Sequence, residues 1–337
     1  MTLASPEQGE VHEALVRMGL VRGGEHPTFE RLTGGVSSDI WRVEVPGRPA
    51  FCVKRALSQL RVAQEWKAPV ERNAYEIAWM QTAATVVPEA VPRILGVDMQ
   101  ARLFAMAYLD PGRYVLWKQQ LRDGNASIAT AQAVARALAR VHAATAGQVK
   151  VAERFPTDDI FYAIRLEPYL VATGRRHPDL APALNALVET TARSKRALVH
   201  GDVSPKNILI GPEGPVFLDA ECAWYGDPAF DVAFCLNHLL LKGVWNRGAV
   251  DDFLACYDAF AAAYFDRVTW ESSADLEQRT ARLLPGLFLA RVDGKSPVEY
   301  ITQESERELV RRTAIPLLRQ PPARLTEIRD AWKRTLQ

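Results

Sequence analysis

The chain has 337 residues, of which 48% are hydrophobic and 24% are charged, and its formal net charge is +1. This length is enough for two lobes that each bury a core. The near-neutral charge gives no electrostatic reason to expect binding to nucleic acid or to an anionic membrane. Apolar runs are too short for a membrane span, and residues 1–10 lack the basic region and apolar core of a signal peptide.

Cysteine usage indicates the compartment. Cys52, Cys222, Cys235 and Cys256 are far apart and show no Cys-x-x-Cys spacing. This pattern argues against a zinc site and favours buried, reduced thiols. We therefore expect a cytoplasmic protein.

The first third of the chain predicts a short helix, then a sheet with a second helix inserted in it. An amphipathic pattern over 7–20 predicts the first helix, and a helical pattern over 57–84 predicts the second. Strand patterns occur at 28–33, 40–45, 51–54, 91–97 and 103–109. Together they predict a five-stranded sheet. Asp110-Pro-Gly is a strong turn signal, and there we place the boundary between an N-terminal lobe, 1–109, and a C-terminal lobe, 110–337.

The segment between the first two strands is rich in small residues. Gly34 and Gly35 allow backbone N–H groups to approach a bound phosphate, and the hydroxyls of Ser37 and Ser38 add hydrogen bonds. The pattern is not Gly-x-Gly-x-x-Gly, so a plain hairpin turn is the alternative. Lys54 ends the third strand and suits the α- and β-phosphates of a nucleotide, with a solvated surface lysine as its alternative.

Glu76, in the second predicted helix, is the carboxylate that we expect to pair with Lys54. Such a pair would hold the lysine where the phosphates lie. Glu65 and Glu71 are alternative partners that the sequence leaves open, and an exposed helix glutamate is the simplest interpretation of Glu76.

From residue 115 onward the patterns are mostly helical. Ser127 suits the N-cap of a helix that runs to about residue 146, and Gly147 ends it. His142 lies on the apolar face of this helix and is expected to be a core residue. Further core helices are expected at 232–242 and 249–267, and charged peripheral helices over 304–337.

Residues 198–231 carry the polar side chains that indicate chemistry. Asp202 and Asn207 lie five residues apart on one loop, and Asp219 ends a second apolar strand. A β-turn at 211–215 folds the strands back on each other, which brings the three side chains together. A kinase catalytic loop has the same Asp-to-Asn spacing. We expect Asp202 to accept the substrate proton, Asn207 to hold Mg²⁺ and Asp219 to bridge the metal ions; a β-hairpin with acidic loops is the alternative.

These motifs resemble the aminoglycoside phosphotransferase and choline kinase superfamily. They are His200-Gly201-Asp202-x4-Asn207, Leu218-Asp219-x-Glu221 and Gly226-Asp227-Pro228-x-x-Asp231, within a resemblance that extends from about residue 28 to about 242. It implies an α+β, two-lobed protein-kinase-like fold, with a nucleotide-binding N-terminal lobe made of a five-stranded antiparallel sheet plus a helix. The larger C-terminal lobe would be mainly helical, carry the catalytic hairpin and bind the acceptor. ATP and Mg²⁺ are the implied cofactors.

The resemblance also assigns supporting roles. Backbone groups around Met106 and Tyr108 would meet the adenine edge. His200 and Asp231 would support the catalytic loop, Asp231 through hydrogen bonds to the loop backbone. Asp231 equally suits the N-cap of the helix that follows it.

Candidate acceptor contacts are more dispersed. Glu221, Trp117 and the segment 158–165 are candidates for the acceptor pocket, and so is Arg291. Arg291 belongs to a charged run with Asp293 and Lys295, for which a capped helix end with surface charges is the alternative. The Gly294-Lys295-Ser296 sequence is not a P-loop, because Leu289 stands where that motif requires glycine.

Within the superfamily, the methylthioribose kinases are the most similar branch. The similar stretches are 106–110, 115–124, 166–169, 223–226 and 237–241. Those kinases differ in having serine at the position of Asn207 and Asp-Pro-Glu at 219–221. We therefore expect the acceptor to be a sugar or a polyol-like molecule.

Two other functions stay open. One is an aminoglycoside or choline/amino-alcohol phosphotransferase, whose acceptors are cationic. The other is a nucleotide-binding pseudokinase. Protein-kinase activity is not expected, because the Asp-Phe-Gly and Ala-Pro-Glu elements are missing. The expected partner is a small-molecule hydroxyl acceptor, and the protein is expected to be a monomer or a homodimer.

Overall fold

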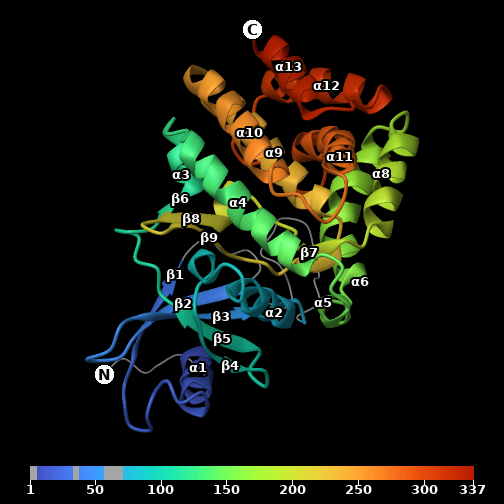
Figure 1. Cartoon of the computed structure of the whole chain (residues 1–337). Helices are drawn as coiled ribbons and strands as arrows, with labels where there is room; N and C mark the ends of the chain where they lie inside the picture. Colours follow the sequence, from blue (N-terminus) through green and yellow to red (C-terminus); the bar gives the residue numbers. More distant parts are fainter. Residues whose placement is uncertain (1–5, 33–37, 57–70) are drawn as a thin grey trace.

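The computed structural model describes residues 6–32, 38–56 and 71–337. An N-terminal lobe built on a sheet lies against a larger, mainly helical C-terminal lobe (Figure 1). The N-terminal sheet has five antiparallel strands in the order β1-β2-β3-β5-β4. Its strands are β1 (Thr28–Leu32), β2 (Ser38–Glu44), β3 (Phe51–Ala56), β4 (Ile94–Asp98) and β5 (Leu103–Ala107). The predicted five-stranded sheet and the two-lobed α+β class are confirmed.

Helices cover both faces of this sheet. Helix α1 (Pro6–Arg17) places Val11 and Leu15 against Trp41 and Val53, and these side chains form a small separate core. Helix α2 (Arg72–Ala84) covers the other face and packs with Phe104 into the main core. Alternation along β2 explains the arrangement, because successive side chains of a strand point to opposite faces.

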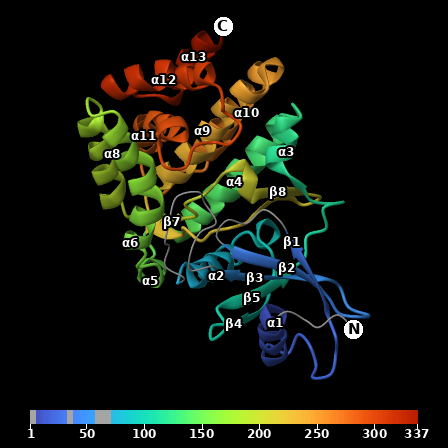
Figure 2. The ribbon, with the colours of Figure 1, turned by 180° about the vertical axis from the view of Figure 1, so that it is seen from behind.

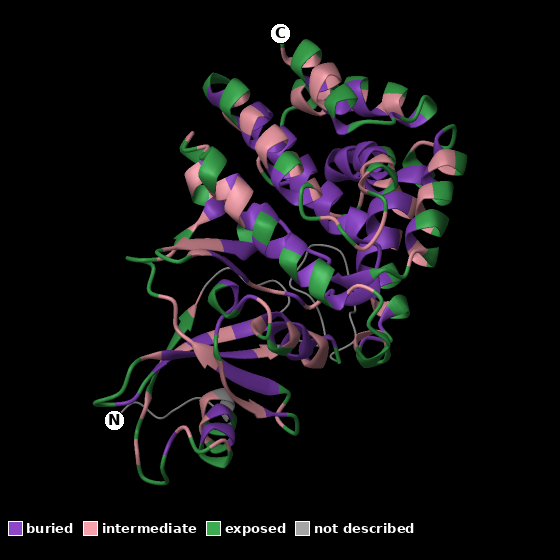
Figure 3. Ribbon diagram, viewed as in Figure 1, coloured by how far each residue is buried: buried purple, intermediate pink, exposed green. Residues whose placement is uncertain are grey.

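The C-terminal lobe forms around helix α9 (Pro228–Trp245), which is buried on nearly all sides (Figure 3). Its long apolar run predicts this, because a helix that is apolar all round has no face suited to water. Helices α4 (Ile128–Thr145), α10 (Val250–Phe265) and α11 (Ser273–Asp293) complete the central layer. The peripheral helices are α3 (Trp117–Arg122), α5 (Val149–Arg154), α6 (Asp158–Phe161), α7 (Ala172–Arg176), α8 (Ala181–Arg193), α12 (Glu304–Arg319) and α13 (Leu325–Leu336). Three short 3₁₀ turns lie at Pro88–Ala90, Pro205–Asn207 and Arg247–Ala249.

Two short sheets lie between the lobes in both views (Figures 1 and 2). Strand β8 (Ile208–Gly211) pairs with β9 (Gly214–Phe217) and β6 (Val115–Leu116), while β7 (Ala197–Val199) pairs with β10 (Trp224–Gly226). The β8–β9 pair is the predicted hairpin. Its turn is tighter than expected, because Gly211 pairs with Gly214 and only Pro212 and Glu213 connect them. Among the described helices, none is long and apolar enough to cross a membrane.

Trp79 on α2 joins the two lobes. Its indole is fully buried, and its ring centroid lies 4.7 Å from that of His200 and 6.2 Å from that of Phe217, both in the C-terminal lobe. Edge-on aromatic contacts of this kind add to the burial of apolar area. Trp79 therefore contributes a large buried contact to the interface between the lobes.

We expect Trp79→Ala to lower the free energy of unfolding by about 3–5 kcal/mol, because it leaves a cavity between the lobes. Chemical denaturation measures the change. Tyr162→Ala is the control, since Tyr162 is exposed and its replacement should change stability by no more than about 0.5 kcal/mol. Equal effects of the two substitutions would contradict the role of Trp79 at the lobe interface.

Candidate active site

The loop that carries Asp202 is fixed by the carboxylate of Asp231, in the first turn of α9. Its Oδ2 accepts the backbone N–H of His200 at 2.7 Å, and its Oδ1 accepts that of Gly201 at 2.8 Å. His142 Nε2 lies 3.2 Å from the same carboxylate, and its Nδ1 lies 2.6 Å from the Tyr264 hydroxyl. His142 is thus a hydrogen-bonded core residue, as predicted. Because Asp231 is fully buried, these bonds act in a low-dielectric setting and hold the loop firmly.

His200 links this loop to the end of β9. Its Nδ1 accepts the backbone N–H of Asp202 at 3.1 Å, and its Nε2 donates to the carbonyl of Leu218 at 3.1 Å. Only a neutral imidazole makes both bonds. Burial lowers the pKa of His200 in spite of the nearby carboxylates of Asp231 and Asp202. The imidazole is therefore a positioning group that keeps residues 202 and 218 in register.

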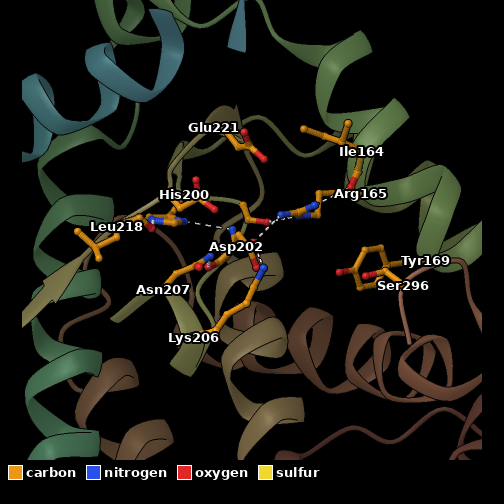
Figure 4. A network of polar contacts seen from close by, with 12 residues as sticks. Ile164, Arg165, Tyr169, His200, Asp202, Lys206, Asn207, Leu218, Glu221 and Ser296 are labelled. Atoms are coloured by element: carbon orange, nitrogen blue, oxygen red, sulfur yellow. Dashed lines mark hydrogen bonds and ion pairs between the residues drawn. The ribbon is translucent and has the colours of Figure 1, made fainter. Parts of the chain in front are cut away.

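The Asp202 carboxylate is held ionised by two cations. Arg165 Nη2 lies 2.9 Å from its Oδ2, and Lys206 Nζ lies 3.2 Å from the same atom. Figure 4 shows both cations pointing at Asp202. Burial alone would raise the pKa of Asp202, but Lys206 and Arg165 outweigh it and hold the pKa well below its usual range. Arg165 also donates to the carbonyl oxygens of Gly201 and Ile164.

Asn207 and Asp219 flank this carboxylate as oxygen donors. The amide nitrogen of Asn207 donates to the backbone carbonyl of Asp202 at 3.2 Å. In the described residues its side-chain oxygen has no hydrogen-bond partner and is left for a ligand. Asp219 follows β9 in a left-handed backbone conformation, with φ at +65°. A non-glycine residue in this region is uncommon, and such conformations concentrate at active sites.

Lys54 pairs with Glu76, as predicted. Its Nζ lies 2.7 Å from Glu76 Oε1 and 2.5 Å from Asp219 Oδ1. Glu71 is exposed just before α2, and Glu65 lies outside the described residues. Burial opposes the charge of Lys54, but Asp219 and Glu76 raise its pKa. Burial raises the pKa of Glu76 to about 7 against the attraction of Lys54.

Glu221 adds a third carboxylate and pairs with Arg72, whose Nε lies 2.9 Å from its Oε2. When Asp202, Arg165 and Lys206 are included, the described site holds four carboxylates and four cations and is close to neutral before a metal ion binds. Mg²⁺ favours carboxylate and amide oxygens and takes the rest of its ligands from phosphates and water, so Asn207 and Asp219 fit it. The described residues contain no cluster of three or more His, Cys, Asp or Glu side chains that would hold a metal alone.

The phosphate-covering loop is only partly described. Gly34, Gly35 and Ser37 lie outside the described residues, and Ser38 is buried at the start of β2. Their phosphate-binding role stays a prediction.

The expected adenine contacts lie at the end of β5. Met106 and Tyr108 are both partly buried there, and the Tyr108 ring lies 5.0 Å from the guanidinium carbon of Arg42. Adenine binding by Met106 and Tyr108 also stays a prediction.

One acceptor assignment needs correction and another is refined. Trp117 is 1% exposed and packs in the main core, so its indole is not available to line an acceptor pocket. Arg291 is buried rather than on the surface, and its Nη1 donates to the Tyr169 hydroxyl at 3.0 Å. Its neighbours Asp293 and Lys295 make ion pairs with other side chains, and Asp293 is buried, whereas the alternative interpretation expected surface charges.

Two residues at Asp202 were absent from the predicted catalytic set. Lys206 lies four residues after Asp202, and that spacing is the only local signal for the pair. Arg165 falls at the end of the segment suspected of lining the acceptor pocket, but nothing in the sequence indicated a contact with Asp202. It lies on a π-helix, Tyr162–Val171, with Pro168 inside. Proline removes a backbone donor, and π-turns are frequent at functional sites.

The geometry and the sequence comparisons agree on the family. A family model described as the phosphotransferase enzyme family matches residues 28–276. This is most of the chain, which therefore belongs to the phosphotransferase enzyme family.

Its relatives include methylthioribose kinases. The chain is 26% identical over 245 residues to that of Yersinia pseudotuberculosis serotype O:1b (strain IP 31758), covering 64% of this chain and 59% of that protein. It is 22% identical over 233 residues to methylthioribose kinase 2 of Oryza sativa subsp. japonica, covering 60% and 54%. The matched region thus spans less than two thirds of the length of these relatives.

Solved structures with a similar fold include small-molecule kinases. The amicoumacin kinase hAmiN in complex with AMP-PNP, Ca²⁺ and Ami superposes with a TM-score of 0.57 at 14% identity, covering 95% of each chain. A Plasmodium vivax ethanolamine kinase superposes with a TM-score of 0.53 at 11% identity, covering 99% of this chain and 90% of that one. At these identities the likeness shows the fold alone.

Gly201 allows the loop to pass close to its neighbour. Its φ is +79°, and a Cβ there would lie 2.5 Å from the backbone oxygen of Cys222. We expect Gly201→Ala to shift the loop and to lower phosphotransferase turnover by more than about 10²-fold, because displacement of reacting groups by about 1 Å has effects of that size.

Gly147→Ala is the matched control for this substitution. Its φ is also positive, at +68°, but a Cβ there meets nothing within 4 Å. We expect a loss of about 1–2 kcal/mol in stability from the left-handed conformation and normal turnover of the folded fraction. Equal turnover of the two variants would contradict the importance of the close approach at Gly201.

Proposed function

We propose that this chain is an ATP- and Mg²⁺-dependent kinase that transfers the γ-phosphate to a hydroxyl of a small sugar- or polyol-like acceptor. The observation that carries the proposal is the ionised Asp202 carboxylate beside Asn207 and Asp219, with Lys54 bonded to both Asp219 and Glu76. Phosphoryl transfer needs this combination of a hydroxyl-positioning carboxylate, metal ligands and a phosphate-binding lysine. Family membership and the methylthioribose kinase relatives support the reaction and the sugar-type acceptor.

Each side chain has a distinct task in this mechanism. Lys54, held by Glu76 and Asp219, would bind the nucleotide phosphates. Mg²⁺ at Asn207 and Asp219 would neutralise the charge of these phosphates. Asp202 would orient the acceptor hydroxyl and receive its proton.

The lowered pKa of Asp202 suits orientation better than strong basicity. The transition state of phosphoryl transfer is loose, so early removal of the proton is not required. Arg165 and Lys206, both on Asp202 Oδ2, would keep the carboxylate charged until the hydroxyl arrives. Positioning and electrostatics would then supply most of the rate acceleration.

The alternative functions are less well supported. Aminoglycoside and amino-alcohol acceptors are cationic, and the cations Arg165 and Lys206 at Asp202 would repel them. A pseudokinase would need no intact set of Asp202, Asn207 and Asp219. A coupled ADP-release screen over thioribose, pentoses, polyols, choline and aminoglycosides separates the three, and activity only with the cationic compounds would overturn the proposal. A cytoplasmic location and a monomeric or homodimeric state accompany the proposal.

We expect Asp202→Asn to lower kcat by about 10²–10⁴-fold, because it removes the proton acceptor. Binding of Mg²⁺ and AMP-PNP, measured by titration calorimetry, should stay near the wild-type value. Asp219→Asn is the matched comparison and should weaken this binding, because it removes a metal ligand and a partner of Lys54. Turnover of Asp202→Asn within a few-fold of wild type would remove Asp202 from its role.

A further inference from the structure

A small pocket opens next to the catalytic loop, on the side of the C-terminal lobe. Pro205 and Lys206 of the loop form one wall. The other walls come from α3, α9, α11 and the segment that follows α11. Since Lys206 Nζ is 3.2 Å from Asp202 Oδ2, a ligand in this pocket would lie beside the proposed proton acceptor.

Four of the nine residues that line the pocket are basic. Lys118, Lys206, Lys242 and Arg291 line it, and Glu299 is the carboxylate among its lining residues. Glu299 is bonded to Lys118, and Lys206 is bonded to Asp202. Lys242 and Arg291 have no carboxylate within ion-pair distance in the described part of the chain. Two buried basic side chains are thus left without a carboxylate partner among the described residues.

Lys242 shows the cost of this arrangement most clearly. It is 1% exposed, and its Nζ lies 4.4 Å from the ring centroid of Trp245 and 4.0 Å from that of Tyr300. Burial, and then the charges of Lys118 and Arg291, lower the pKa of Lys242 to about 7, although Glu299 acts in the other direction. A buried ammonium without an anion is expensive and is rarely kept for stability alone.

Further polar atoms around the pocket lack partners. The Nε2 of His238, the Nε of Arg291 and the hydroxyl of Tyr300 are buried and make no hydrogen bond to the described residues. Arg291 is held in place by Tyr169 and by the backbone carbonyl of Ser296, and Figure 4 shows these two residues next to each other. Native proteins rarely leave so many buried polar atoms without a partner in one place.

We propose that this pocket binds an anionic group of the acceptor, so that the substrate is a sugar or polyol that already carries a phosphate monoester or a carboxylate. The proposal rests on the proposed function and narrows its acceptor. An oxyanion would compensate Lys242 and Arg291 and accept hydrogen bonds from the unpartnered donors. Its attachment in the pocket would leave a hydroxyl of the same molecule to reach Asp202.

The reaction itself is unchanged by this group. The acceptor hydroxyl oxygen forms a bond to the γ-phosphorus of ATP, and the bond from that phosphorus to the β–γ bridging oxygen breaks. ADP leaves with the electron pair, and the hydroxyl proton passes to Asp202. The anionic group takes no part in bond making and acts only by holding the acceptor.

Matched acceptor sets test the proposal. Each set contains a neutral sugar, the same sugar with one phosphate monoester, and the corresponding sugar acid, and ADP release is measured for each. We expect kcat/KM to be about 10- to 100-fold higher for one charged member than for the neutral one, which is the range of a charge-assisted contact. The phosphate and acid arms distinguish the two kinds of anion. A neutral member used as well as both charged members would overturn the proposal and leave the kinase function intact.

Lys242→Met is the decisive variant, because methionine keeps the length and the ring contacts but not the charge. It should remove the preference for the charged acceptor while binding of Mg²⁺ and AMP-PNP shows that the protein is folded. Lys118→Gln, at the rim of the pocket, should reduce the preference in the same direction. Lys150→Met is the control, since Lys150 is exposed on α5, and it should leave the preference unchanged. Equal effects of Lys242→Met on neutral and charged acceptors would contradict the proposal.

Inorganic sulfate provides a readout that needs no turnover. We expect sulfate to raise the Tm of the wild-type protein and to have a smaller effect on Lys242→Met, because a ligand of the folded state stabilises it. If no acceptor set is turned over, the kinase function fails for these sugars, and the sulfate result alone decides on the pocket. If sulfate does not raise the Tm, or raises it equally in the wild type and in Lys242→Met, the proposed anion binding in the pocket is overturned.

The pH dependence of stability gives an independent check. In the folded protein the pKa of Lys242 is lowered from its ordinary value of 10.5 to about 7. Between these values the unfolded chain binds more protons, so this group makes the wild type more stable as the pH rises. The Tm of Lys242→Met minus the Tm of the wild type should therefore be largest below pH 7 and should shrink toward pH 10. A lower Tm for Lys242→Met throughout this range would indicate a structural lysine and contradict the proposal.

Discussion

The buried ammonium of Lys54 connects the two lobes at the active site. Lys54 belongs to the N-terminal sheet, and it bonds to Glu76 in the same lobe and to Asp219 in the other. Breaking either contact would leave a buried charge without compensation, which costs more than an exposed ion pair contributes. The relative position of the lobes is therefore tied to the atoms that would hold nucleotide and metal. With nucleotide bound, phosphate oxygens and Mg²⁺ would share the charge that this network now balances internally.

The C-terminal side of the site is organised by hydrogen bonds instead of ion pairs. Asp231 holds the backbone of His200 and Gly201, and the His200 ring connects residues 202 and 218. Hydrogen bonds within the protein thus fix the conformation of the loop. Ion pairs occur at Asp202, where Arg165 and Lys206 hold its carboxylate ionised. A rigid loop backbone that carries a charged side chain is the arrangement that preorganised catalysis requires.

The sequence predicts the sheet, the hairpin and the central polar residues because their signals are local. Strand alternation, the turn at 211–215 and the spacing from Asp202 to Asn207 all lie within short windows. Glu76 could be chosen as the expected partner of Lys54, but the neighbouring glutamates could not be excluded, because helix rotation decides which glutamate faces the strand. Trp117 was misassigned because an aromatic residue after a lobe boundary suits a pocket as well as a core. Arg165 and Lys242 could not be assigned partners from the sequence, because their neighbours come from distant segments.

The π-helix that carries Arg165 limits how far sequence comparison extends into this site. A π-turn contains more residues than the 3.6 of an α-turn. The segment Tyr162–Val171 therefore uses more residues per turn than the α-helices around it. A relative with one residue fewer here would regain α-helical geometry and turn its equivalent side chain to another direction. An aligned arginine in such a relative would not face the aspartate, and an arginine offset by one position would be its true counterpart. A change of helix register is therefore a second way, besides replacement of a side chain, to alter which residue of this segment faces Asp202.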